Sequence, residues 1–341
     1  MKENKEQDFK KLLLETDEEK VVNLSLRPKS FKDFIGQKNI IHTLDLSIKA
    51  AQKRDEPLEH VLFAGPPGLG KTSLAYCIEA ELNSKIVATS GPAIERAGDL
   101  IGILTNLDRG DILFIDEIHR LSKIVEEFLY PAMENFQIDF VIDKGPYAKS
   151  IKFNLKPFTL IGATTRQGLI SSPLRGRFGL FFNFEFYSYE DLSEIIKRSS
   201  MMLEVSIDEE ARLEIATRSR GTPRLANRIL RRVRDYAQVH EVSIITRDVV
   251  IKSLEVLRVD SSGLDDFDRR YLRVLIETYT GGPAGIEAIA ASLNESTDTL
   301  IDVVEPYLLQ QGFIKRGPRG RIATESAYLH LGIKFDKNIE A

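Results

Sequence analysis

The stretch Gly65-Pro66-Pro67-Gly68-Leu69-Gly70-Lys71-Thr72 decides the fold of this chain, because it satisfies the pattern G-x-x-x-x-G-K-[ST]. Apolar residues 60–64 before it predict a strand, and residues 71–82 after it predict a helix. In that context the glycines let consecutive backbone N–H groups converge on phosphate oxygens, and the helix dipole adds positive charge at the same point. The stretch therefore predicts a nucleotide-binding loop and not an ordinary glycine-rich turn.

The side chains of this loop predict ATP and Mg²⁺ as cofactors. Lys71 is placed to reach the β- and γ-phosphates, and the Thr72 hydroxyl is a suitable ligand for Mg²⁺. Gly68, Gly70 and Ser73 complete the part of the ATP site that the loop supplies.

A second apolar strand, at residues 112–115, ends in two carboxylates, Asp116 and Glu117. Ligands of parallel sheets bind at the carboxyl ends of the strands, so Asp116 is expected beside the metal. Glu117 is placed to polarise a water for in-line attack on the γ-phosphate. Downstream of a phosphate-binding loop, this pair predicts hydrolysis and not binding alone. His119 follows the pair and could sense the site, but we interpret it as a structural residue.

The buried strand that ends at residues 162–166 carries two candidate sensors. Either Thr164 or Thr165 could contact the γ-phosphate or orient the attacking water. Further along, Gly221-Thr222-Pro223-Arg224 begins a helix, and Arg224 could point back to the phosphates.

A loop at residues 172–178 offers two arginines, Arg175 and Arg177. One of them could act in trans as an arginine finger, neutralising charge on the γ-phosphate of a neighbouring subunit.

The order of elements predicts three folded units. Residues 24–186 alternate apolar strands with amphipathic helices, as in a parallel sheet covered on both faces, with one β-hairpin at 137–155 around Asp143-Lys144-Gly145-Pro146. Residues 187–258 are helical, with helices expected at 191–203, 208–218 and 223–240. Residues 259–335 begin with a polar linker and continue as short helices and a β-ribbon, the pattern of a winged helix. Residues 1–23 form a charged, solvated tail.

The ribbon concentrates positive charge in a chain whose net charge is -4. Such a patch would contact DNA phosphates without sequence preference; its members are Lys315, Arg316, Arg319 and Arg321. The preceding helix carries Asp298, Asp302 and Glu305, which disfavours deep insertion into the major groove. We therefore favour contact between the wing and the DNA backbone over a protein-binding winged helix.

Composition narrows the cellular setting. No apolar run approaches the ~18 residues that a membrane span needs, and the N-terminus lacks the features of a signal peptide. The single cysteine, Cys77, fits a reducing compartment, so a cytoplasmic protein is expected.

The chain resembles the RuvB family of bacterial Holliday junction branch-migration motors from about residue 24 to residue 335. The matching motifs are GPPGLGKT (65–72), ILFIDEIHRL (112–121), IGATTR (161–166), SPLRGRFG (172–179), GTPR (221–224) and GFIKRGPRGRIA (312–323). The first two are common to AAA+ ATPases, whereas LRPKSFKDFIGQ (26–37), SPLRGRFG, GTPR and the terminal motif are more selective.

The resemblance implies an AAA+ P-loop domain, a small helical lid domain and a C-terminal winged helix. It also implies a homohexameric ring that encircles duplex DNA and pulls it through a junction held by RuvA, with the RuvC resolvase in the wider complex. The hairpin at 137–155 is the element expected to dock RuvA.

The resemblance also implies roles for individual residues. Thr165 would be the sensor, with Thr164 as the alternative, and Arg177 is favoured over Arg175 as the finger. Arg316 and Arg321 would grip DNA phosphates. The residues expected near the nucleotide are Leu26, Arg27 and Ile35 at the adenine, Tyr187, Pro223 and Arg224 from the lid, and Glu134, Asn135 and Phe136.

Two alternatives to a motor stay open. A clamp-loader-like AAA+ ATPase would use DNA to trigger ring opening, although loaders carry a helical collar in place of the basic wing. A nucleotide-switched DNA-binding regulator would show sequence preference and would tolerate very slow hydrolysis.

Overall fold

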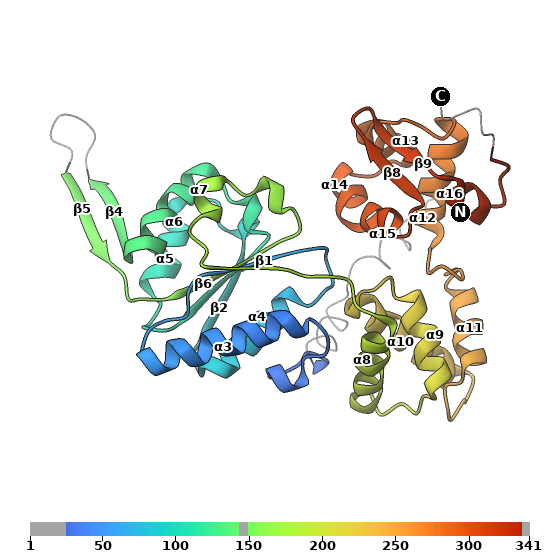
Figure 1. Ribbon diagram of the computed structural model, residues 1–341, viewed down its shortest axis with the longest axis horizontal. Helices are drawn as coiled ribbons and strands as arrows, with labels where there is room; N and C mark the ends of the chain where they lie inside the picture. Colours follow the sequence, from blue (N-terminus) through green and yellow to red (C-terminus); the bar gives the residue numbers. More distant parts are fainter. Residues whose placement is uncertain (1–24, 143–148, 336–341) are drawn as a thin grey trace.

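The computed structural model describes residues 25–142 and 149–335 (Figure 1). The predicted tail at 1–23 and the predicted hairpin turn at 143–146 lie outside the described residues. Within the described ranges, no helix combines the length and the apolar character needed to span a membrane.

A parallel sheet in the strand order β2-β3-β6-β1-β7 forms the centre of the large domain. The strands are β1 (Val61–Ala64), β2 (Ile86–Ser90), β3 (Ile112–Asp116), β6 (Thr159–Thr164) and β7 (Leu180–Asn183). The three inner strands are almost wholly buried and match the predicted apolar runs. The edge strands β2 and β7 are only partly buried. These two strands are not predicted from the sequence, because their apolar patterns are weaker.

Helices cover both faces of this sheet (Figure 1). The helices of the domain are α3 (Lys38–Arg54), α4 (Lys71–Leu82), α5 (Ala97–Thr105), α6 (Lys123–Asn135) and α7 (Ser172–Arg175). Alternate side chains of one strand pack on opposite faces, as the pleat requires. Phe63 joins the core under α3 and α4, whereas Leu62 joins the core under α5 and α6.

The expected β-hairpin is present and projects from one end of the large domain (Figure 1). It consists of β4 (Gln137–Ile142) and β5 (Lys149–Asn154), which pair antiparallel with Ile138 opposite Phe153. Ile138 is buried at the base, whereas Phe153 is 45% exposed. The hairpin therefore carries apolar surface beyond the core of the domain.

Four helices form the lid: α8 (Tyr189–Met202), α9 (Glu209–Arg218), α10 (Pro223–Val239) and α11 (Arg247–Val256). The first three lie within two residues of their predicted ranges. Their apolar faces join the core that lies under α3 and α4, with Phe184 and Tyr187 at the connection. The lid thus packs on the side of the sheet that carries the phosphate-binding helix.

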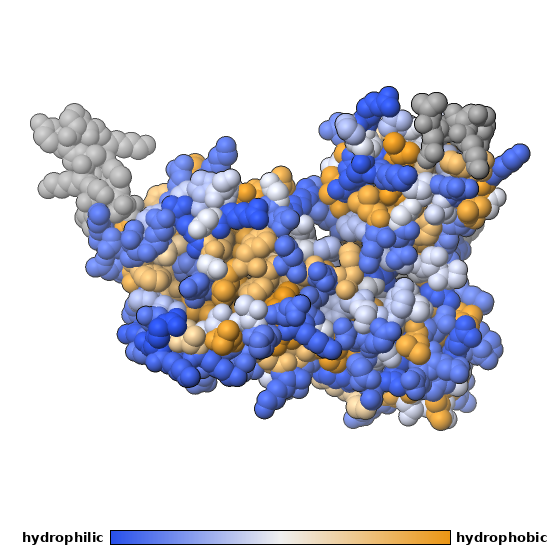
Figure 2. Space-filling view, viewed as in Figure 1, coloured by the Kyte–Doolittle hydropathy of each residue, from blue (hydrophilic) through white to orange (hydrophobic). Residues whose placement is uncertain are grey.

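The C-terminal unit has its own core and is a winged helix. Its helices are α12 (Asp266–Arg273), α13 (Ile286–Leu293), α14 (Thr297–Thr299), α15 (Glu305–Gln310) and α16 (Glu325–His330), with π-helical turns at Val274–Thr278 and Leu300–Val304. The wing is the ribbon β8 (Ile314–Gly317) and β9 (Gly320–Ala323). The predicted fold class, a P-loop α/β domain with a helical lid and a winged helix, is confirmed. On the face that Figure 2 shows, hydrophobic side chains gather over the middle of the large domain and hydrophilic side chains cover most of the rest.

Candidate ATP and DNA sites

The phosphate-binding loop leads from the end of β1 into the first turn of α4. Gly65 and Gly70 have φ values of 141° and 97°, which non-glycine residues rarely adopt. A Cβ on Gly65 would also lie 2.9 Å from the Phe184 carbonyl oxygen. Glycine is therefore required at position 65 both by conformation and by space.

Lys71 begins α4 and is 7% exposed. Its Nζ donates to the carbonyl oxygens of Gly65 at 2.7 Å and Pro66 at 2.8 Å. Burial lowers the pKa of Lys71 to about 8, against the opposing effect of the nearby Asp116 and Glu117 carboxylates. The ammonium is thus close enough to the two carboxylates for their charge to act on it. Thr72 and Ser73 follow in the first turn of the same helix and are partly buried.

Asp116 is the last residue of β3 and Glu117 follows it, beside the end of β6 in the sheet. Asp116 Oδ1 accepts a hydrogen bond from the Glu117 backbone N–H at 3.0 Å, and Glu117 has a left-handed φ of 50°. Burial, followed by the charge of Asp116, raises the pKa of Glu117. A carboxylate with a raised pKa is better matched to taking a proton from water near neutral pH.

The two threonines at the end of β6 have different partners. The Thr165 hydroxyl donates to Glu117 Oε2 at 3.4 Å. Thr164 is fully buried, and its Oγ1 lies 2.9 Å from His119 Nδ1. The contact with Glu117 favours Thr165 as the sensor, which stays a prediction.

The lid places two predicted residues against the phosphate-binding loop. Tyr187 is buried, and its hydroxyl donates to the Leu69 carbonyl oxygen at 3.1 Å. The backbone N–H of Arg224 donates to the Gly68 carbonyl oxygen at 3.3 Å. Pro223 occupies the first position of α10, where a missing N–H is tolerated. The start of α10 therefore adjoins the loop, and the role of Arg224 toward the phosphates stays a prediction.

The predicted adenine-side residues lie around α4 and the lid. Leu26 is buried, and its carbonyl oxygen accepts from Arg198 of α8 at 3.1 Å. The Arg27 guanidinium lies 5.5 Å from the centre of the Tyr76 ring. Ile35 packs, partly buried, on the core that joins the large domain to the lid.

Glu134 and Arg177 lie together at α6, away from the phosphate-binding loop. Arg177 Nη2 pairs with Glu134 Oε1 at 2.9 Å, and its guanidinium lies 4.3 Å from the Tyr130 ring centre. Among the described residues, the contacts of Arg177 lie on α6 and α7 and include none with residues 65–72 or 116–117. This position suits an arginine that serves a neighbouring subunit. Arg175 instead stacks on Phe181 at 4.9 Å.

Asn135 and Phe136 complete the predicted nucleotide-proximal segment, but neither lies at the phosphate-binding loop. Asn135 is the exposed last residue of α6. Phe136 packs edge-on against His60 and Phe158, with ring centres 6.3 and 5.8 Å away. The side chain of Phe136 is thus part of the core beside the hairpin.

The four basic residues of the wing differ in their surroundings. Lys315, Arg316 and Arg319 are exposed, whereas Arg321 is partly buried. Arg316 and Arg321 both pair with Glu305, which is fully buried; the two Nε atoms lie 2.9 Å from its carboxylate oxygens. These two ion pairs are not predicted from the sequence. They neutralise Glu305 and hold the two guanidinium groups in position.

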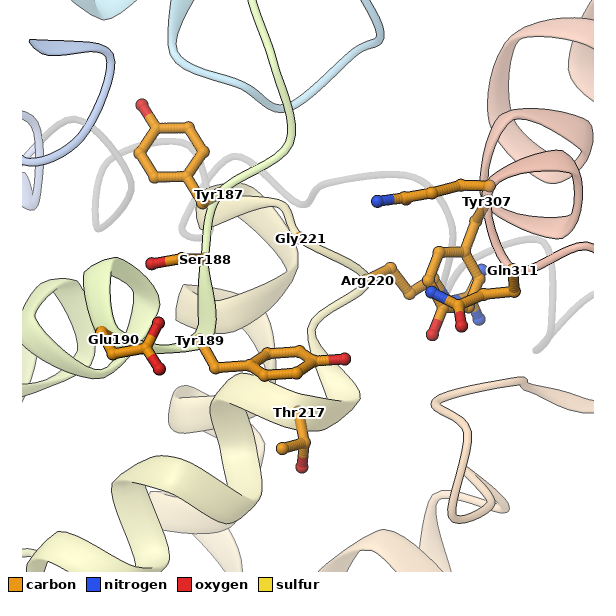
Figure 3. Close-up of a pocket in the computed structure, with 10 residues that line it drawn as sticks. Tyr187, Ser188, Tyr189, Glu190, Thr217, Arg220, Gly221, Tyr307 and Gln311 are labelled. Atoms are coloured by element: carbon orange, nitrogen blue, oxygen red, sulfur yellow. The ribbon is translucent and has the colours of Figure 1, made fainter.

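A cavity of about 230 Å³ separates the lid from the winged helix (Figure 3). Arg220 of the lid lies across it toward Tyr307, with the guanidinium 5.5 Å from the ring centre. Tyr187 points away from the cavity toward the large domain. The cavity is therefore distinct from the phosphate-binding loop.

Thr72 and Asp116 are the residues that could hold a magnesium ion. A hydroxyl and a carboxylate suit Mg²⁺, which keeps waters and phosphate oxygens as its other ligands. The described ranges contain no cluster of three or more His, Cys, Asp or Glu side chains able to hold a metal by themselves.

A P-loop beside Asp-Glu, with a lid helix adjoining the loop, defines an AAA+ ATPase. Three family models match the chain: the Holliday junction DNA helicase RuvB P-loop domain at 26–184, the RuvB AAA lid domain at 187–260 and the RuvB C-terminal winged helix domain at 261–332. The chain belongs to the RuvB family.

Relatives support the same assignment over nearly the whole chain. The Holliday junction branch migration complex subunit RuvB of Desulfosudis oleivorans is 55% identical over 322 residues, which are 94% of each chain. RuvB of Thermotoga petrophila is 56% identical over 92% of this chain and 94% of the relative. The solved structure of the Thermotoga maritima RuvB Holliday junction branch migration motor superposes with a TM-score of 0.86 at 52% identity, covering 92% of this chain and all of that one.

Proposed function

We propose that this chain is an ATP-driven motor that moves Holliday junctions during recombination and DNA repair in the cytoplasm. The observation that carries the proposal is the convergence of Lys71, Glu117 and Arg224 on one loop, in a chain that also bears a basic wing. The relatives named above are subunits of a Holliday junction branch migration complex.

In the proposed mechanism each group has one task. Lys71 neutralises the β- and γ-phosphates. Thr72 and Asp116 would hold Mg²⁺, which would supply positive charge beside the phosphates. Glu117, whose Oε2 accepts from the Thr165 hydroxyl at 3.4 Å, takes a proton from the attacking water. Arg177 of one subunit reaches the γ-phosphate bound by the next, so the active unit is a ring, for which we propose a hexamer.

We propose that the lid and the wing convert hydrolysis into movement. Because Arg224 adjoins Gly68, a change in the phosphates moves α10 and, through it, the lid. Lys315, Arg316 and Arg319 are exposed on the wing and would contact DNA phosphates, and Glu305 holds Arg316 and Arg321 in position. The hairpin 137–155, with the exposed Phe153, is the proposed contact for RuvA, and RuvC would act in the wider complex.

The test is the dissociation of a synthetic four-way DNA junction with ATP and Mg²⁺, with and without RuvA. We expect ATP-dependent dissociation that RuvA stimulates. Glu117→Gln should bind ATP but turn it over at least ~10²-fold more slowly, the usual size of a general-base effect. Glu127→Gln, an exposed carboxylate on α6, is the matched control and should behave as wild type.

Two other outcomes would redirect the proposal. Tight ATP and DNA binding without junction movement would favour a clamp-loader-like ATPase or a nucleotide-switched regulator. Near-normal turnover in Glu117→Gln would remove Glu117 from the mechanism.

A further inference from the structure

A line of contacts leads from the catalytic carboxylate to the end of β6. His119 Nε2 lies 3.4 Å from Glu117 Oε2, and His119 Nδ1 lies 2.9 Å from Thr164 Oγ1. The backbone N–H of Arg166 donates to the same Thr164 oxygen at 3.0 Å. Because an ionised Glu117 carboxylate can only accept, a neutral His119 carries its N–H at Nε2, facing Glu117, and its Nδ1 accepts from the Thr164 hydroxyl. His119 and Thr164 together orient the carboxylate of Glu117, the proposed general base.

The side chain of Arg166 extends this line into the winged helix. Its Nε and Nη2 donate to the two carboxylate oxygens of Asp302 at 2.7 Å each, and Nη2 also donates to Asp298 at 2.8 Å. Two parallel bonds to one carboxylate fix the guanidinium in direction as well as in distance. Only 21% of the Arg166 side chain and 24% of the Asp302 side chain is exposed, which weakens the competition from water.

This contact explains two acidic residues that the DNA-binding interpretation left unassigned. Asp298 and Asp302 lie on the helical segment before the wing, where negative charge opposes entry into a DNA groove. In the structure that face packs on the large domain, beside the end of β6.

Arg166 makes the polar contacts that join the large domain to the winged helix. Over the described ranges, every hydrogen bond and ion pair between these two domains involves Arg166. The joint between lid and winged helix is firmer, because Arg220 pairs with Asp265 at 3.2 Å and with the buried Asp268 at 2.5 Å. A turn of the lid and winged helix as one body relative to the large domain would therefore separate Arg166 from Asp298 and Asp302.

We propose that Arg166, Asp298 and Asp302 form a latch, and that the two aspartates are positioning residues for ATP hydrolysis although they lie in the DNA-binding domain. With the latch closed, Arg166 is held beside the Thr164–His119 pair that orients Glu117. DNA that moves the winged helix opens the latch and changes the restraint on Glu117. The inference rests on the proposed function, because it needs hydrolysis and DNA binding in one chain.

The first experiment measures the latch without any turnover. Leu46→Cys on α3 and Leu329→Cys on α16 introduce thiols at positions 64% and 70% exposed, on separate domains (Figure 1). The native Cys77 is fully buried and its thiol pKa is raised to about 12 by burial, so it stays unlabelled. Energy transfer between dyes at 46 and 329 should give a narrow distance distribution, which Asp298→Asn/Asp302→Asn should broaden.

The second experiment measures coupling as the ratio of ATP turnover with duplex DNA to turnover without it. Asp298→Asn/Asp302→Asn should lower this ratio at least about fivefold, the lower end of typical coupling between sites. The KM for ATP should change less than about twofold, because neither aspartate contacts the phosphate-binding loop. Adding Arg166→Gln to the double variant should lower the ratio no further, since all three residues act through one contact. Asp302→Glu, which keeps the carboxylate, should retain most of the ratio.

Glu277→Gln/Glu287→Gln is the matched control, because it removes two exposed carboxylates from the same domain. It should leave both the distance distribution and the ratio as in wild type. An unchanged distribution in Asp298→Asn/Asp302→Asn, or a broadened one with an unchanged ratio, would overturn the latch. Wild-type protein without any DNA-stimulated turnover would instead count against the motor function, and the dye measurement distinguishes the two failures.

Discussion

The backbone N–H of Arg224 donates to the carbonyl oxygen of Gly68, so the first turn of the lid helix α10 rests on the phosphate-binding loop. A Cβ on Gly68 would lie 3.1 Å from the Arg224 Cβ, which shows how closely the two segments approach. The lid and the phosphate-binding loop therefore meet at Arg224, whose backbone N–H makes the contact and whose side chain carries a positive charge.

Arg224→Ala keeps the backbone contact and removes the charge. We expect kcat/KM for ATP to fall at least about tenfold, because a hydrogen bond to a charged group contributes about 1.5–3 kcal/mol. Steady-state ATPase assays measure this, with Lys252→Ala, an exposed lysine of α11, as the control. Equal activity in the two variants would mean that Arg224 does not reach the phosphates.

A mixing experiment tests whether Arg177 acts on a neighbouring subunit. Arg177→Ala should bind ATP but lose hydrolysis by about 10³-fold, the lower range for an arginine finger. Lys71→Ala should not hydrolyse ATP either. Mixing the two inactive proteins creates interfaces in which one subunit supplies Lys71 and the other Arg177, so part of the activity should return.

The control for this experiment is Arg175→Ala, whose guanidinium stacks on Phe181. It should lose far less activity than Arg177→Ala. A mixture that stays inactive would place Arg177 outside a shared site, and a larger loss at Arg175 would reverse the assignment of the two arginines.

The parts of the site that could be predicted from the sequence are formed by residues that are adjacent in the chain. Lys71 and Thr72 sit in the loop that makes their site, and Asp116 and Glu117 sit at the end of a buried strand. In a parallel sheet the ends of such strands meet at one edge, so local pattern and fold geometry suffice.

The missed parts depend on contacts between distant segments. Arg166 and Asp302 are 136 residues apart, and no local pattern connects them. Glu305 looks like an unfavourable charge in a DNA-binding helix until two wing arginines neutralise it. The sequence interpretation of His119 as a structural residue is incomplete. In the structure one ring nitrogen of His119 contacts Thr164 on the adjacent strand, and the other faces Glu117.

His60 predicts a specific pH dependence of stability. It is buried; its Nδ1 accepts the Leu160 N–H at 2.9 Å, and its Nε2 lies 3.0 Å from the Met133 carbonyl oxygen, which fits a neutral ring. Burial lowers its pKa. The unfolded state therefore binds the proton more readily, so this contribution is complete above the unfolded pKa of about 6.5 and is lost as pH falls below it, by at most about 1.4 kcal/mol per pH unit.

His60→Gln keeps an amide for hydrogen bonding but does not titrate. Urea unfolding between pH 7 and pH 5 should show a shallower loss of stability in this variant than in wild type. His42→Gln removes an exposed histidine and should keep the wild-type slope. Identical slopes in all three proteins would show that His60 is not a source of acid sensitivity.

Substitutions of the wing arginines are expected to distinguish residues that stabilise the fold from residues that bind DNA. Arg321 is 16% exposed and pairs with the buried Glu305, so Arg321→Ala removes one of the three side chains that hold that carboxylate and leaves Arg316 and the Tyr271 hydroxyl. We expect the free energy of unfolding to fall by about 1.5–3 kcal/mol in urea titrations, the contribution of a hydrogen bond to a charged group. Arg319→Ala should leave stability unchanged, because Arg319 is exposed.

Duplex DNA binding measured across salt concentrations gives the complementary result. Arg319→Ala should weaken binding of all sequences alike and reduce the slope of log K against log salt by about 0.9, the value for one lost phosphate contact. If Arg321 serves mainly to neutralise Glu305, then Glu305→Gln/Arg321→Gln should recover stability and keep the wild-type salt slope. A reduced slope in that double variant would instead show that Arg321 contacts phosphate directly, and that Glu305 holds it in place to do so.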